Sequence, residues 1–112
     1  TRLGLAMGAK PMTFAGLAGM GDLILTATGG LSRNRALGIA LAKGERLEQY
    51  TATHRTVAEG VNTARSAVGL AARYGVALPI TAQVAAILFE GKAPKQAVAD
   101  LMERTLKAEQ WR

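Results

Sequence analysis

The chain has 112 residues, 49% of them hydrophobic and 20% charged, which is typical of a soluble globular protein with one core. It contains no cysteine and a single histidine, His54, so disulfides, thiol catalysis and a histidine metal cluster are excluded, and we expect no metal site. A formal charge of +6 favours anionic partners such as phosphates, nucleotides, nucleic acid or acidic lipid, without choosing among them. No apolar run approaches the roughly 18 residues that span a bilayer, and no signal-peptide pattern opens the chain.

Helical periodicity runs through the chain, and glycine or proline interrupts it at helix-like spacing, so the sequence predicts an all-α fold. In the first half, the predicted helices span residues 3–9, 11–17, 22–28, 33–43 and 45–50. Pro11 suits a first helical turn, and Ser32 suits the N-cap of the helix that Gly44 ends. The glycines in residues 19–21 predict a tight connection between two helices.

The most regular apolar pattern lies in the second half of the chain. Apolar residues recur there at spacings of four and three, which places them on one face of a helix: Val57, Val61, Ala64, Val68 and Ala71. Thr56 with Glu59 fits a capping box at the start of this helix, and Gly75 fits its end. Two more helices begin at prolines, with the inward faces Ile80, Val84, Ile87 and Leu88 after Pro79 and Ala97, Val98, Leu101 and Met102 after Pro94. Together the helices predict a single compact multi-helix domain.

Asp22 is the only acidic residue between Thr1 and Lys43, and it directly follows a glycine-rich run. The order of these glycines matches neither a dinucleotide-binding fingerprint nor a P-loop. Asp22 suits the N-cap or first turn of a helix, where the dipole favours a carboxylate. It also suits a carboxylate held at a rigid corner, able to bond a substrate hydroxyl, and both interpretations stay open.

The run Ser32-Arg33-Asn34-Arg35 combines a capping hydroxyl, an amide and two guanidinium groups at a predicted helix start. Unpaired backbone N–H groups and the positive end of the dipole lie there too, and this combination suits a phosphate. The alternative is a capped helix with a solvated basic first turn. Since the dipole disfavours Arg33 and Arg35 at this end, their presence points to an anion. Glu59 is a capping acid that can also meet a ligand, and His54 is a loop residue.

Several blocks of residues occur in the order and at the separation found in one enzyme family. They are Gly16-Leu17-Ala18-Gly19-Met20-Gly21-Asp22-Leu23, Thr26-Ala27-Thr28, Leu31-Ser32-Arg33-Asn34-Arg35 with Gly38, Val57-Ala58-Glu59-Gly60, Leu78-Pro79-Ile80-Thr81 and Gly91-Lys92. Over essentially its whole length, the chain closely resembles the bacterial-type NAD(P)-dependent glycerol-3-phosphate dehydrogenases. The resemblance implies that residues 1–112 form most of a C-terminal all-α substrate-binding domain of the 6-phosphogluconate dehydrogenase C-terminal type. The N-terminal Rossmann domain is absent from this chain, which begins at Thr1 and is expected to be a fragment or a processed product.

The resemblance also implies roles for particular side chains. The matching positions are Asp22, Ser32, Arg33 and Asn34 for the substrate, and Arg33, Val57 and Glu59 for the cofactor. The family's general-base lysine lies upstream of this chain, so we expect no catalytic residue here, and Lys10 is not its counterpart.

The implied reaction is reversible hydride transfer between sn-glycerol 3-phosphate and dihydroxyacetone phosphate, with NAD or NADP bound mainly by the missing Rossmann domain. Its product supplies phospholipid synthesis. The implied partners are the substrate, the protein's own Rossmann domain and a second subunit in a homodimer. The implied location of the enzyme is the cytoplasm. The chain alone is expected to be inactive.

Two other interpretations are possible. A helical nucleic-acid-binding module would explain the +6 charge, but aromatic residues are only 4%, the basic residues are scattered and no recognised motif occurs. A purely structural or dimerisation domain would explain the helices. The six glycines between residues 16 and 38 argue against it, because packing alone does not call for them.

Overall fold

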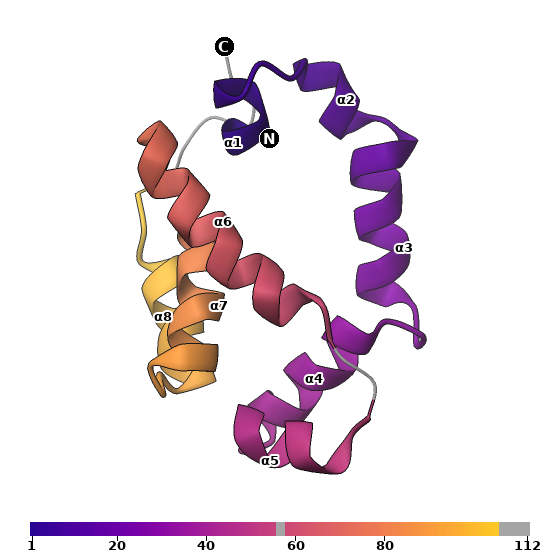
Figure 1. Cartoon of the computed structure of the whole chain (residues 1–112), viewed down its shortest axis with the longest axis vertical. Helices are drawn as coiled ribbons and strands as arrows, with labels where there is room; N and C mark the ends of the chain where they lie inside the picture. Colours follow the sequence, from indigo (N-terminus) through magenta and orange to yellow (C-terminus); the bar gives the residue numbers. More distant parts are fainter. Residues whose placement is uncertain (56–57, 106–112) are drawn as a thin grey trace.

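The structure is a computed structural model that describes residues 1–55 and 58–105 (Figure 1). Within these residues every element is helical, which confirms the predicted all-α class. The elements are α1 (Arg2–Ala6), α2 (Pro11–Ala15), the π-helix η1 (Leu17–Gly21), α3 (Asp22–Thr28), α4 (Arg33–Ala42), α5 (Leu47–Thr53), α6 (Gly60–Tyr74), α7 (Pro79–Phe89) and α8 (Pro94–Met102).

The helices form two groups around α6, the longest of those described. Helix α7 packs between α6 and α8, while α4 contacts both α8 and α5. On the other side of the view in Figure 1, α2, η1 and α3 follow one another as an arm, here called the α2–α3 arm (residues 11–28). Helix α1 returns to α6, and Arg2 Nη1 donates a hydrogen bond to the carbonyl oxygen of Ala77 at 3.1 Å. The N-terminal helix is thereby fixed to the α6–α7 connection.

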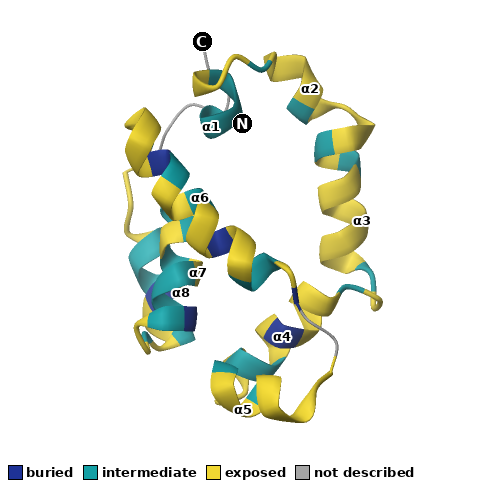
Figure 2. Cartoon of the chain, in the orientation of Figure 1, coloured by how far each residue is buried: buried dark blue, intermediate teal, exposed yellow. Residues whose placement is uncertain are grey.

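The main core cluster lies where α4, α6 and α7 meet (Figure 2), and Leu47 and Tyr50 of α5 pack against it. The buried hydrophobic residues are Leu37, Ala58, Ala64, Ala71, Leu88 and Ala97. Four of the six are alanines, and their small side chains let the helix backbones approach closely. Ala64 and Ala71 lie on the predicted apolar face of α6, and Val61 on the same face is partly buried against the core. Val57, the first residue of the predicted face, lies outside the described residues.

Several predicted inward-facing residues are in fact exposed. Ile80 is 66% exposed on α7, and Val98 and Met102 are 60% and 81% exposed on α8. On α8 the buried residue is Ala97, and the next residue along a helix lies about 100° away around the axis. The contacts of α8 with α7 and α4 therefore leave the Val98 face uncovered.

Helix starts and ends agree well with the sequence. Prolines open α2, α7 and α8 at their first residues, and Ser32 caps α4 as predicted. Gly44, Gly75 and Gly91 follow the ends of α4, α6 and α7 with φ of +98°, +64° and +71°, a backbone region that glycine enters without strain. Helix α5 begins two residues later than predicted, because Gln49 Oε1 accepts the backbone N–H of Arg46 at 2.9 Å and defines its first turn.

The predicted connection at residues 19–21 is wrong, because this segment is the π-helix η1 and continues directly into α3. The backbone of Gly21 is right-handed helical, with φ −61° and ψ −48°. The break between α2 and η1 lies at Gly16 instead, which is extended at φ −85° and ψ −166°. A Cβ atom on Gly19 would lie 2.2 Å from the backbone oxygen of Phe14, so close packing of η1 on α2 explains this glycine. The glycine-rich run is therefore weaker support for a functional site than its composition indicates.

Candidate functional site

The start of α4 presents several donors at one point. Ser32 Oγ accepts the backbone N–H of Arg35 at 3.2 Å, and the carbonyl oxygen of Ser32 accepts the N–H of Ala36 at 3.1 Å. The N–H groups of Arg33 and Asn34 have no acceptor one turn earlier in the helix. Because Ser32 uses a lone pair for its cap, its hydroxyl proton stays available for a ligand oxygen. With the exposed guanidinium of Arg33, this helix start can bind an anion such as a phosphate.

A single side chain joins the start of α4 to the start of α6. Asn34 Oδ1 accepts the backbone N–H of Gly60 at 2.9 Å, across 26 residues of sequence. Gly60 is the first residue of α6, and Glu59 directly before it is exposed. The structure therefore brings the predicted substrate group Ser32, Arg33 and Asn34 next to the predicted cofactor contact at Glu59. Val57, the other predicted cofactor contact, lies outside the described residues.

The capping box predicted at Thr56 and Glu59 is wrong. Helix α6 begins at Gly60, so Glu59 precedes the helix and cannot be its third residue. The side chain of Glu59 makes no capping hydrogen bond, and Thr56 lies outside the described residues. The physical reason is that Asn34 supplies the acceptor for the first N–H of α6 from another helix. Among the described residues, no side-chain hydrogen bond of Glu59 is seen at this helix start, so its exposed carboxylate can accept hydrogen bonds from a ligand.

Asp22 is the first residue of α3, but it does not cap a free helix start. Because η1 precedes it without a break, backbone N–H groups at this junction already bond to the carbonyl oxygens of Leu17 and Gly19. The hydroxyl of Thr26 donates to the carbonyl oxygen of Asp22 at 2.9 Å, so that side chain bonds the helix backbone. Asp22 is therefore not an N-cap, whereas its predicted place in the first turn of a helix is confirmed.

The exposed carboxylate of Asp22 stands next to a π-helical turn, a feature often found at functional sites. Thr28, the last residue of α3, follows Asp22 by six positions, which corresponds to about 9 Å along the helix axis. Within the described residues, no hydrogen bond or ion pair connects the Asp22 side chain to α4 or α6. The structure thus gathers the α4 and α6 residues of the predicted site and leaves Asp22 on the α2–α3 arm.

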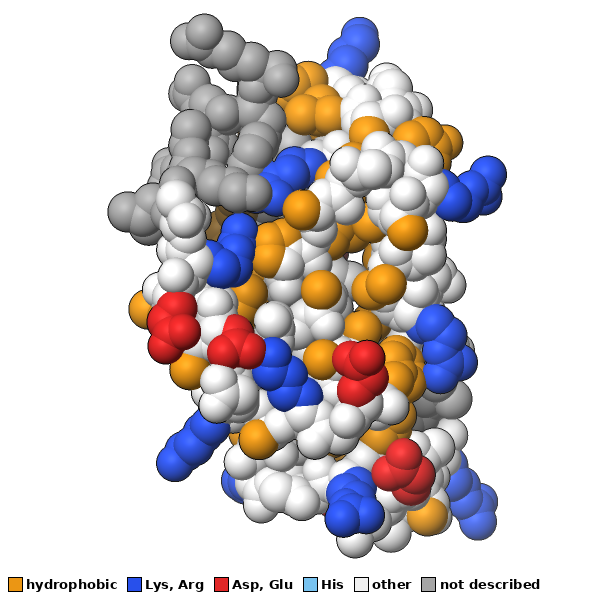
Figure 3. Space-filling view, turned by 90° about the vertical axis from the view of Figure 1, so that its left-hand side faces the viewer, with side chains coloured by type: hydrophobic (Ala, Val, Ile, Leu, Met, Phe, Trp, Pro, Cys, Tyr) orange, Lys and Arg blue, Asp and Glu red, His pale blue; other side chains and the backbone are white. Residues whose placement is uncertain are grey.

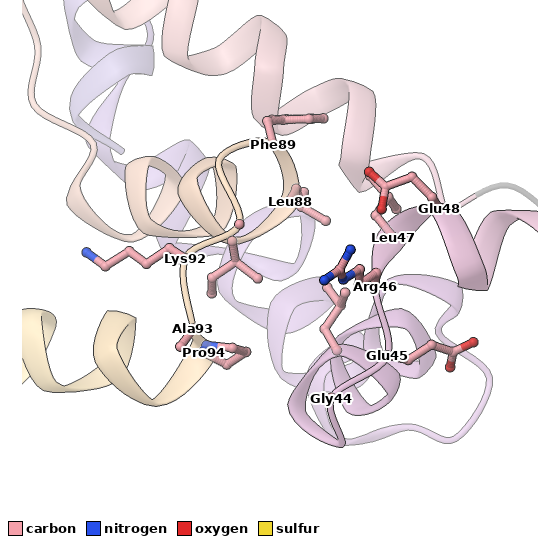
Figure 4. A pocket seen from close by; sticks show the side chains of 13 residues that line it. Gly44, Glu45, Arg46, Leu47, Glu48, Leu88, Phe89, Lys92, Ala93 and Pro94 are labelled. Atoms are coloured by element: carbon pink, nitrogen blue, oxygen red, sulfur yellow. The ribbon is translucent and has the colours of Figure 1, made fainter.

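Two cavities flank α5, and neither contains a predicted site residue. The first, of about 460 Å³, lies between the α4–α5 and α7–α8 connections (Figure 4). The Lys92 side chain at this cavity extends away from Arg46 and forms an ion pair with Asp100. The ion pair and a hydrogen bond from Gln96 hold the pKa of the Asp100 carboxyl below its ordinary value. The Lys92 ammonium is therefore engaged in a contact within the protein.

The second cavity, of about 490 Å³, lies between α5, α6 and α7. Two of its polar side chains, His54 and Arg65, contact aromatic rings of the protein. The ring of His54 stacks on Tyr50 with 3.8 Å between centroids, and the guanidinium of Arg65 lies 4.3 Å from the centre of the Phe89 ring. His54 follows the last residue of α5, as its predicted place in a loop requires.

Charged side chains are spread widely over the face shown in Figure 3, where acidic side chains lie among the lysines and arginines of the lower half and the upper half carries separate basic side chains. Such a distribution lacks the continuous basic stripe that tracks a nucleic-acid backbone. Among the described residues, no helix combines the length and apolarity needed to cross a membrane. In the same part of the chain, no three acidic or histidine side chains gather as metal ligands.

The chain is thus an all-helical domain in which two helix starts lie together, one rich in anion-binding donors and one directly preceded by an exposed carboxylate. Residues 1–99 match the family described as NAD-dependent glycerol-3-phosphate dehydrogenase C-terminus. The chain therefore belongs to the glycerol-3-phosphate dehydrogenase family and corresponds to its C-terminal part.

Individual relatives agree with this assignment. A glycerol-3-phosphate dehydrogenase [NAD(P)+] from Geobacter sulfurreducens is 60% identical over 99% of this chain and 33% of its own length. The enzyme of that name from Syntrophotalea carbinolica is 58% identical over 97% of this chain and 33% of its own length. The crystal structure of glycerol-3-phosphate dehydrogenase from Coxiella burnetii superposes with a TM-score of 0.87 at 40% identity, covering 92% of this chain and 32% of that one. The chain thus spans about a third of the length of the curated relatives it matches.

Sequence reasoning missed one residue of this site. Gly60 occurs in the recognised block of residues 57–60, but nothing in the local sequence signals that its N–H bonds to Asn34. The contact depends on how α4 and α6 pack, because its two partners are 26 residues apart in the sequence.

Proposed function

We propose that this chain is the C-terminal substrate-binding part of an NAD(P)-dependent glycerol-3-phosphate dehydrogenase. The enzyme would interconvert sn-glycerol 3-phosphate and dihydroxyacetone phosphate, supplying glycerol 3-phosphate for phospholipid synthesis in the cytoplasm. The observation that carries the proposal is the 60% identity with such an enzyme along almost the whole chain. The donor-rich start of α4 supports it, because a small phosphorylated polyol needs a phosphate clamp.

In this proposal, the start of α4 holds the phosphate. Arg33 offers a planar fork to two phosphate oxygens, while Ser32 Oγ–H and the unpaired N–H groups donate to the others. Asp22 accepts a hydrogen bond from a substrate hydroxyl once the α2–α3 arm is in place. These groups bind and orient the substrate, whereas the proposed general-base lysine belongs to a part of the enzyme outside this chain.

The cofactor would meet this chain at Arg33, Val57 and Glu59. Glu59 fits such a role because it is exposed, precedes α6 and makes no capping bond of its own. Its carboxylate can accept hydrogen bonds from a sugar hydroxyl or an amide, and Arg33 can face a cofactor phosphate. When bound, the nicotinamide supplies the hydride chemistry. The proposed Rossmann domain would provide most of the NAD or NADP contacts.

The exposed surface of the chain supports a further partner, the remainder of the same polypeptide. The accessible surface is 8606 Å². A complete folded monomer of this mass, 11.7 kDa, exposes about 5,900 Å². Much of the difference comes from the α2–α3 arm, where large apolar side chains are 50 to 91% exposed: Met12, Leu17, Met20, Leu23, Ile24 and Leu25. We infer that the remaining two thirds of the enzyme cover this arm, and that two complete subunits form a homodimer.

The test is an assay of the complete enzyme and of residues 1–112 in parallel. Oxidation of NADH or NADPH is followed with dihydroxyacetone phosphate and, as a control, with unphosphorylated dihydroxyacetone. We expect turnover by the complete enzyme with the phosphorylated substrate alone. We expect none by residues 1–112, because orientation of the reacting groups is lost when half a site is missing. Equal rates with both triose substrates, or turnover by the isolated chain, would contradict the proposal.

A further inference from the structure

We propose that Asn34 and Gly60 form a positioning contact that sets the geometry of the candidate site, with Gly60 required for it although it has no side chain. The inference rests on the proposed function. It adds Gly60 as a positioning residue, one that contacts neither substrate nor cofactor itself. The contact is the 2.9 Å hydrogen bond from the Gly60 N–H to Asn34 Oδ1. It links the helix start that would hold the phosphate to the one that would meet the cofactor.

The bond fixes the direction of the Asn34 side chain. An amide group is planar, so fixing its oxygen also fixes the direction of its two N–H donors. Asn34 is exposed, and without a partner its side chain would sample several rotamers. Held by Gly60, the amide presents its donors in one direction beside Arg33. Asn34 can therefore serve a bound phosphate without first losing rotamer freedom.

Glycine at position 60 lets the Asn34 amide approach the helix backbone, and a larger residue would displace that amide. A methyl group there would lie 2.6 Å from Asn34 Oδ1 and 2.9 Å from Asn34 Cγ, both far inside van der Waals contact. The backbone of Gly60 is helical, so a positive φ does not explain the residue. The close approach of Asn34 does explain it.

The contact is not what holds the fold together. Ala58, Leu37 and Leu88 are buried in one cluster that already joins α4, α6 and α7 near this point. A clash at position 60 can be relieved by rotating the exposed Asn34 side chain, without moving either helix. Gly60→Ala should therefore displace the Asn34 amide and leave the domain folded. Function and stability can then be measured separately.

The experiment compares Gly60→Ala with Gly69→Ala in the complete enzyme. Gly69 lies in the same helix, and a Cβ atom there would have no neighbour within 4 Å. Gly60→Ala should raise KM for dihydroxyacetone phosphate roughly 2- to 13-fold, the effect of losing one ordinary hydrogen bond. The kcat should change less, and Gly69→Ala should leave both unchanged. The melting temperatures of the two variants should agree within a few degrees.

A double variant tests whether the effect passes through Asn34. If it does, Gly60→Ala adds nothing in an Asn34→Ala background, because the contact is already gone. Additive effects of the two substitutions on KM would overturn the proposal. So would a Gly60→Ala enzyme with the KM of the Gly69→Ala control.

A binding measurement separates this inference from the proposed function. Titration of the complete protein with inorganic phosphate, followed by NMR at the Arg33 and Asn34 amides, does not depend on turnover. Weaker phosphate binding in Gly60→Ala than in Gly69→Ala supports the positioning contact even if the protein does not oxidise NADH. Equal phosphate binding by both variants overturns it, even if the protein proves to be the proposed dehydrogenase.

Discussion

Arg33 lies at the end of α4 where the helix dipole repels a cation. It is exposed, and within the described residues no ion pair or hydrogen bond from its guanidinium offsets that repulsion. Ser32 and Asn34 on either side are engaged with the backbone of α4 and α6. An anion bound at this helix start, as proposed above, would offset the repulsion.

Replacing Arg33 with lysine in the complete enzyme should impair catalysis without affecting the fold. Lysine keeps the charge but loses the planar fork that contacts two phosphate oxygens. Loss of a charge-assisted hydrogen bond costs about 1.5–3 kcal/mol, which corresponds to roughly 10- to 100-fold in kcat/KM. The measurements are kcat/KM for dihydroxyacetone phosphate and the melting temperature. Arg73→Lys, in the last turn of α6 where a cation is favourable, is the matched control.

Wild-type kinetics in Arg33→Lys would exclude the phosphate clamp. A fall in melting temperature that matches the loss of activity would instead identify Arg33 as a structural residue.

For single residues, the sequence predicts the hydrogen bonds that a side chain makes within its own helix turn. The Ser32 cap was predictable because its partner, the N–H of Arg35, lies three residues away. The role of Glu59 was not, because the group that replaces it as cap comes from Asn34, far away in sequence. Local patterns carry no information on such a partner.

Among the elements, η1 departs most from the sequence prediction. Two glycines around Met20 favour a turn, yet η1 and α3 form one continuous helical segment. Glycine is permitted in a helix at a modest cost and here allows a close approach to α2. Tertiary packing decided between two conformations that the local sequence allows, so the prediction failed where packing was decisive.

Gly19→Ala should destabilise the protein, whereas Gly38→Ala should stabilise it. A Cβ atom on Gly19 would lie 2.2 Å from the Phe14 backbone oxygen, which cannot rotate away, so α2 and η1 must separate. Such overpacking costs about 1–3 kcal/mol. Gly38 lies inside α4 with open space around its Cβ direction, so alanine gains about 0.5–1 kcal/mol of helix stability. Thermal unfolding of both variants and the wild type is the measurement. Equal melting temperatures for the two variants would show that η1 does not pack on α2 in this way.

For the whole molecule, periodicity predicted the helices and their apolar faces, and the all-α class followed directly. It could not predict which of those faces is covered. Ile80, Val98 and Met102 lie on apolar faces and remain exposed, as do the large side chains of the α2–α3 arm. Figure 2 shows that the ribbon of this arm is mostly exposed. A helical pattern records that a face is apolar, whereas burial depends on a second surface that packs against it. For the α2–α3 arm, we propose that the remainder of the complete enzyme provides this second surface.

Leu25 provides the test of that interpretation. It is 71% exposed on α3, so Leu25→Lys should leave the melting temperature of residues 1–112 nearly unchanged. In the complete enzyme, the same substitution should lower the melting temperature. There the arm is proposed to be covered, and losing the burial of a leucine costs about 1.5–3 kcal/mol, before the penalty for an unpaired buried charge. Ser66→Lys, at an exposed position of α6, is the control in both proteins. The same small effect of Leu25→Lys in both would show that the arm stays open in the complete enzyme. Conversion of a dimer to a stable monomer would show that a second subunit, rather than the same polypeptide, covers it.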